Sequence, residues 1–134
     1  MAHTMMLKAL VGLEAAKKLR ADAKLRDDAT SRVYYALYHA CWAFLQTRRP
    51  PEPFDKPVDY VGTPNWYHHN KLGEKLAKHS EFSRVVGNRW AQLLAKARSN
   101  RVKADYRPET VEAVVLDDLV QQIEAVVKNL RALC

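Results

Sequence analysis

Apolar residues recur along this chain at intervals of three and four, the spacing of one face of an α-helix. No segment alternates with the period of two that is typical of a β-strand. Five helices follow from this pattern, over 4–25, from 27 or 28 to 48, over 65–79, from 80 or 83 to the Arg107-Pro108 pair, and over 109–130. The sequence therefore predicts an all-α bundle of four long helices plus a shorter one.

The 134 residues suit a single domain, 1–134, with one hydrophobic core. Five prolines fall between residues 49 and 64 and predict a stiff, irregular loop between the second and third helices. Asp27 or Asp28 is expected to cap the second helix, and the fourth helix is expected to start near Ser80 or Ser83.

The expected core positions lie on one face of each long helix. In the first helix they are Leu7, Leu10, Val11 and Leu19; in the second, Tyr34, Leu37, Tyr38, Cys41, Phe44 and Leu45; in the fourth, Val86, Trp90, Leu93, Leu94 and Ala97; and in the last, Val111, Val114, Val115, Leu119, Ile123, Val126, Val127 and Leu130.

A second face of the helix from 27 to 48 is polar in an otherwise apolar segment. At 100° per residue, its members form a stripe: Arg32, Tyr35, Ala36, His39, Ala43 and Gln46. The small residues would let a neighbouring helix or a ligand approach closely, and the polar ones would need partners if buried.

The fourth helix carries a matching feature at Arg101, which falls in line with Trp90 and Leu94. We therefore expect Arg101 to point inward, with Asp105 at i+4 as its partner, while Lys96 and Lys103 face solvent. Such a pair could fix the helix register alone. Alternatively, with Arg32 and His39, it could form the opposite wall of a polar cleft.

Charge is unevenly distributed around a net value of +7. Residues 81–107 hold seven basic side chains and two acidic ones, whereas residues 108–134 hold five acidic and two basic ones. This asymmetry favours contact with nucleic acid or an acidic protein, the alternative being a solvated helix face.

Several classes of protein are excluded by pattern. The longest apolar run, 33–45, is too short to span a bilayer, and no signal peptide is visible, so we expect a cytoplasmic protein. Cys41 and Cys134 predict a buried small hydrophobe and a frayed end of the chain. We expect no metal and no cofactor, because ligand spacings and glycine-rich phosphate loops are absent from the sequence.

Two segments together resemble the HEPN superfamily, in its bacterial and archaeal "SRxYYAxxH … ADY" type. They are Ser31-Arg32-Val33-Tyr34-Tyr35-Ala36-Leu37-Tyr38-His39 and Arg101-Val102-Lys103-Ala104-Asp105-Tyr106. The similarity covers nearly the whole chain outside the proline-rich segment. It implies a helical bundle that forms a homodimer.

The resemblance also implies a kind of function. The superfamily includes metal-independent RNases that act as toxins or in prokaryotic defence, often beside a nucleotidyltransferase-like antitoxin. In those RNases an arginine and a histidine, separated by four to six residues, lie at a dimer cleft before the last helix. This chain has Arg101 there, but Asp105 and Tyr106 stand where the histidine would be.

Three functions follow as hypotheses. The protein could bind RNA, a nucleotide or a partner protein through the polar cleft, with Tyr35, Arg98, Asn100, Lys103 and Asp105 as binding residues. It could be a metal-independent RNase, with Arg32 and His39, or Arg101 and Tyr106, as catalytic residues. It could also be a non-catalytic subunit that assembles with an antitoxin or nucleotidyltransferase-like partner.

Overall fold

The computed structural model of the chain describes residues 2–48, 66–79, 83–108 and 110–134. The elements in these ranges are α1 (Ala2–Leu19), the 3₁₀ turn η1 (Ala23–Leu25), α2 (Arg26–Thr47), α3 (Trp66–Ala77), α4 (Arg84–Tyr106) and α5 (Ala113–Leu133). The prediction of an all-α bundle with four long helices and a shorter one is confirmed. The expected proline-rich loop, 49–64, lies outside the described residues.

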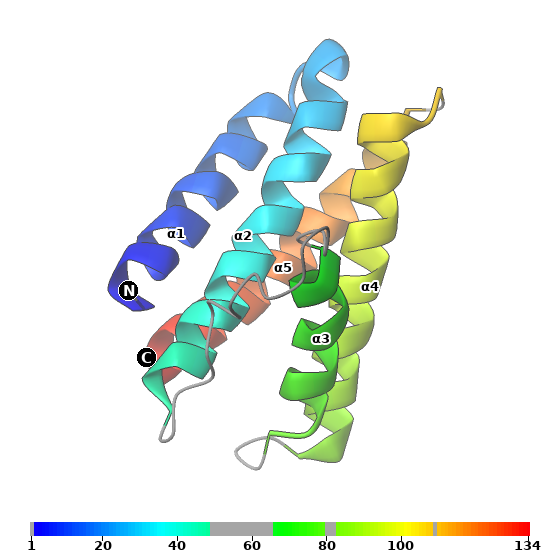
Figure 1. Ribbon diagram of the computed structural model, residues 1–134. Helices are drawn as coiled ribbons and strands as arrows, with labels where there is room; N and C mark the ends of the chain where they lie inside the picture. The colour runs from blue at the N-terminus through cyan, green and yellow to red at the C-terminus, as the bar shows by residue number, and fades with distance from the viewer. Residues whose placement is uncertain (1, 49–65, 80–82, 109) are drawn as a thin grey trace, which may run out of the picture.

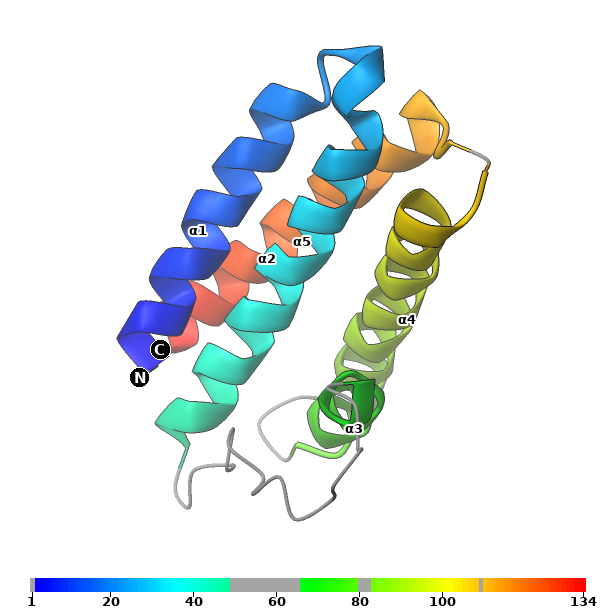
Figure 2. The same cartoon turned by 45° about the horizontal axis from the view of Figure 1, so that its top comes forward.

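Helix α2 is the centre of the bundle (Figures 1 and 2). Helices α1 and α4 lie on opposite sides of it, α5 crosses behind it, and α3 packs against α4. Helix α1 runs antiparallel to α2, while α5 runs parallel to it. Because α2 contacts each of the other α-helices, most of its surface is covered.

The small residues of the expected polar stripe are buried, and α1 lies against Ala36. Ala36 and Ala43 are buried, and a methyl group added at Gly12 of α1 would lie 3.6 Å from Ala36 Cβ. Helices α1 and α2 therefore pack directly against each other at Gly12 and Ala36. A neighbouring helix thus lies against this part of the stripe.

The expected apolar face of α1 is partly wrong. Leu7 and Val11 are 49% and 68% exposed, while Leu10 and Leu19 are only partly buried. The buried residues of α1 are instead Met5, Met6, Ala9, Leu13 and Ala16. Helix α1 packs through a face rich in small residues, which brings it close to α2, and leaves two of its large apolar side chains outside. In α5, Val114 is likewise 69% exposed.

The end of the first helix and the start of the second also differ from the prediction. The first helix ends at Leu19, because Asp22 begins a separate 3₁₀ turn and its side chain accepts a hydrogen bond from the backbone N–H of Lys24 at 2.9 Å. Asp27 and Asp28 do not cap α2; they lie in its first turn, where carboxylates interact favourably with the helix dipole. Ser83 is the N-cap of the fourth helix, and its hydroxyl accepts from Val86 N–H at 3.2 Å.

Helix α5 begins at residue 113 rather than 109, and it is tied to α2 near both ends. Asp27 Oδ1, at the start of α2, accepts a hydrogen bond from the backbone N–H of Val111 at 3.4 Å. Arg48, just after α2, donates from Nη2 to the carbonyl oxygen of Leu133 at 2.6 Å. These two contacts fix the parallel register of α2 and α5.

Candidate functional site

Arg101 points inward, as predicted, and pairs with Asp105. Its side chain is 19% exposed, and its Nε lies 3.0 Å from Asp105 Oδ2, one helical turn further along α4. Two aromatic rings face the guanidinium, with their centroids 5.2 Å away for Tyr35 and 5.6 Å for Tyr106. Contacts of this kind contribute about 0.5–2 kcal/mol each, depending on desolvation. Arg101 therefore links α4 to the polar stripe of α2 through Tyr35.

Arg32 and His39 lie in a different place, a groove of about 550 Å³ between α1 and α2. Arg32 is exposed and His39 is half-buried. The groove is completed by Thr4, Leu7, Lys8, Val11, Gly12, Ser31, Tyr35 and Ala36. Arg32 and His39 line this groove together, whereas Arg101, which contacts Asp105 and Tyr106, does not line it. Tyr35 alone belongs to both sets.

His39 is surrounded by aromatic and cationic groups. The rings of Tyr35 and Tyr38 lie 6.2 Å and 5.5 Å from its own, between centroids. Burial lowers the pKa of His39 below its ordinary value of 6.5, and the charge of Lys8 lowers it further. At neutral pH His39 is therefore an uncharged imidazole, the form that can accept a proton.

This environment predicts a pH-dependent stability. As the pH falls below 6.5, the unfolded chain binds the proton before folded His39 does, so stability is lost until the pH reaches the lower pKa of the folded state. We expect the loss between about pH 7 and about pH 5 to be smaller in His39→Gln. Urea unfolding followed by circular dichroism measures it, with exposed His3 replaced by Gln as the control. Equal losses in wild type and His39→Gln would contradict the prediction.

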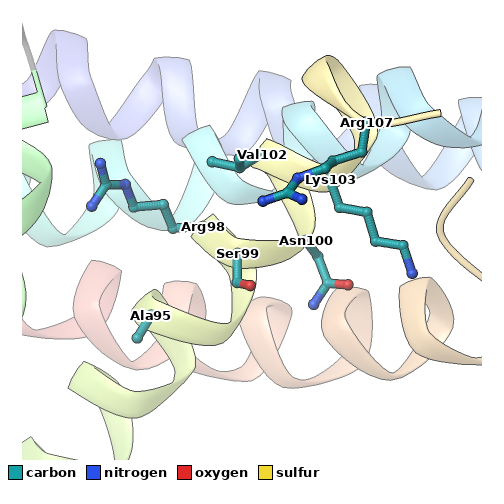
Figure 3. A pocket seen from close by; sticks show the side chains of 7 residues that line it. All are labelled: Ala95, Arg98, Ser99, Asn100, Val102, Lys103 and Arg107. Carbon is teal, nitrogen blue, oxygen red and sulfur yellow. The ribbon is translucent and has the colours of Figure 1, made fainter. Parts of the chain in front are cut away.

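A second concavity, of about 600 Å³, lies on the outer face of α4 (Figure 3). Asn100, Lys103 and Arg107, at intervals of three and four, line it together with Ala95, Arg98, Ser99 and Val102. We call this the α4 hollow. It contains three of the five expected binding residues, Arg98, Asn100 and Lys103, whereas Tyr35 and Asp105 lie elsewhere. In Figure 3, Arg98 extends away from Lys103 and Arg107.

Ser99 and Arg107 were not expected in such a site. In the sequence, Arg107 adds to the basic charge of 81–107 but serves only to mark the end of the helix, because it precedes Pro108. In the structure it is the residue that follows α4, and its side chain turns back over the hollow (Figure 3). The spacing of four residues between Lys103 and Arg107 could have indicated that both side chains lie on the same face.

Most acidic side chains of α5 form ion pairs with basic residues of the same chain. The pairs are Glu124 with Lys17 and Lys128, Asp117 with Arg20, and Asp118 with Lys96. Hydrogen bonds from Gln122 and Lys96 lower the pKa of Asp118. By contrast, Lys103 and Arg107 have no ion-pair partner among the described residues. The basic residues whose charge is not compensated therefore include Lys103 and Arg107, which line the α4 hollow.

The described residues contain no group of three or more histidine, cysteine or acidic side chains placed to hold a metal ion. None of the helices over these residues combines the length and the apolar character needed to cross a bilayer. Cys41 is fully buried, as expected, and burial raises the pKa of its thiol; Cys134 is exposed.

Comparison with known proteins gives no match: no family model, curated protein or solved structure is significantly similar to the chain. Over the described residues, the structure defines an all-α bundle with a basic hollow on α4 and a groove between α1 and α2.

Proposed function

We propose that this protein is a HEPN-type bundle of the toxin–antitoxin or defence kind, which forms a homodimer and binds RNA through the α4 hollow. The observation that carries the proposal is the placement of Lys103 and Arg107 in one hollow without acidic partners among the described residues. The resemblance adds support, since its two segments lie on the neighbouring helices α2 and α4, which meet where Arg101 faces Tyr35.

The chemistry of the hollow suits a phosphate backbone. Lys103 and Arg107 supply positive charge, and Arg presents a planar fork of donors that matches phosphate oxygens. Asn100 already donates through its side-chain nitrogen to the carbonyl oxygen of Lys96 at 3.0 Å, and its amide oxygen is the group that could accept from base or ribose groups. Neutralising phosphates releases bound counterions, so affinity of this kind falls steeply with salt.

Fluorescence anisotropy with a labelled single-stranded RNA of about 20 nucleotides tests the proposal. We expect Lys103→Gln/Arg107→Gln to weaken binding by about tenfold or more at low salt. The same variant should lower the slope of log affinity against log salt by about one to two, because two phosphate contacts are lost.

The matched control is Lys18→Gln/Lys24→Gln, which removes two exposed charges from α1 and η1. It lowers the net charge by the same amount but leaves the hollow intact, so RNA affinity should change little. Equal weakening by the two double variants, or no RNA binding to the wild type at low salt, would overturn the proposal.

A second candidate function is metal-independent RNA cleavage by Arg32 and His39. The observation that favours it is their presence in one groove with an uncharged imidazole beside two cations, Lys8 and Arg32. His39 could then accept the proton of a ribose 2′-OH, and Arg32 could stabilise the charge on the phosphate. Cleavage in excess EDTA that His39→Gln lowers by about 100-fold or more would support it. Intact RNA with the wild type would exclude it.

A further inference from the structure

The groove between α1 and α2 has an apolar wall that nothing in the described structure covers. Leu7 and Val11 are four residues apart on α1, so they lie on one face, 49% and 68% exposed. Gly12 and Ala36 form a low floor between the two helices, since their close approach leaves no long side chain there. Such a floor between two ridges is a shape that accepts a third helix.

The rim of this groove is positively charged. Lys8 on α1 and Arg32 on α2 both line it, and neither has an ion-pair partner among the described residues. The groove lining includes no aspartate or glutamate. An occupant would therefore gain from acidic side chains beside its apolar ones, and basic side chains would be repelled.

We propose that this groove binds an α-helix of a partner protein, a helix with an apolar face flanked on both edges by acidic residues. Its apolar face would cover Leu7, Val11 and the Gly12–Ala36 floor, and its acidic edges would meet Lys8 and Arg32. This surface is separate from the RNA-binding hollow: α1 and α4 lie on opposite sides of α2, and the two sets of lining residues do not overlap (Figure 1).

A second copy of the chain fits the groove less well. Helix α5 is its most acidic element, but Asp117, Asp118 and Glu124 are held in ion pairs within the chain. Close to Asp117 and Asp118 in α5, Val114 is the exposed large apolar side chain. Helix α5 therefore lacks an apolar face with free acidic residues on both edges. RNA cleaved by Arg32 and His39, the second candidate function, would occupy the same groove, but its phosphate backbone would leave Leu7 and Val11 uncovered.

A displayed library of helical peptides of about 18 residues tests the proposal. Each peptide carries leucines at i, i+4, i+7 and i+11, and its flanking positions are free to be Glu, Lys or Gln. Selection on the full-length protein should enrich Glu at the flanks. The best peptide, labelled and free in solution, should bind Val11→Asp at least about tenfold more weakly. No enrichment, or enrichment of Lys or Gln, overturns the proposal.

Charge reversal and a matched apolar control sharpen the result. The variant Lys8→Glu/Arg32→Glu should lose the Glu-flanked peptide and gain affinity for its Lys-flanked counterpart. Val114→Asp introduces the same change at an equally exposed valine outside the groove and should bind like the wild type. The proposal would also be overturned if Val114→Asp and Val11→Asp lost peptide affinity equally. It would be overturned too if Val11→Asp weakened RNA binding while peptide binding persisted. Lys103→Gln/Arg107→Gln should keep peptide affinity, so failure of the RNA proposal is recognised separately.

Discussion

Leu37→Ala is expected to lower the free energy of unfolding by about 3 kcal/mol, the largest loss among the changes considered. Leu37 lies midway along α2, the central helix, and is fully buried. Truncation removes apolar contacts and leaves a cavity that close-packed neighbours fill only partly. Because domains of this size are stable by about 5–15 kcal/mol, such a loss would be clearly visible.

Urea unfolding followed by circular dichroism measures this loss. The control is Leu7→Ala, the same chemical change at a side chain that is 49% exposed, and it should cost less than about 1 kcal/mol. If the two variants lose similar stability, α2 is not the centre of the core.

Two glycine-to-alanine changes are expected to act in opposite directions. A methyl group added at Gly87 of α4 would lie 3.1 Å from Ala77 Cα and from the carbonyl oxygens of Leu76 and Ala77. These are backbone atoms at the end of α3, which cannot rotate away. We expect Gly87→Ala to lower the free energy of unfolding by about 1–3 kcal/mol.

Gly12→Ala is the matched comparison, because the added methyl group finds only ordinary contacts. Its nearest neighbours would be Arg32 O at 3.5 Å and Ala36 Cβ at 3.6 Å. Alanine favours the helix over glycine by up to about 1 kcal/mol, so Gly12→Ala should stabilise the protein. The same unfolding measurements test both changes, and a stabilising Gly87→Ala would contradict the packing of α4 on α3.

Features set by positions along one helix could be predicted from the sequence. The inward direction of Arg101 follows from the face defined by Trp90 and Leu94, and Asp105 falls within reach at i+4. Ser83 has the side chain and the position of a helix cap. The confirmed all-α class rests on the same periodicity.

Features set by contacts between helices could not be predicted in this way. Periodicity places Leu7 and Val11 on an apolar face, but it does not say that α1 packs through Ala9, Gly12 and Ala16 instead. It also does not say which helix covers Ala36. For that reason, periodicity alone did not show that Arg32 and His39 line the α1–α2 groove while Arg101 and Asp105 do not; Tyr35 lies between the two sets.

The ties between α2 and α5 have a consequence for the order of folding. The Asp27–Val111 and Arg48–Leu133 contacts join residues 84 and 85 positions apart, whereas α1 and α2 are neighbours in the chain. Closing a long loop costs more entropy than closing a short one, and local contacts form faster. We therefore expect the α1–α2 hairpin to form early and the α2–α5 pair to close late. The groove that carries Arg32 and His39 would then take shape before the core is complete.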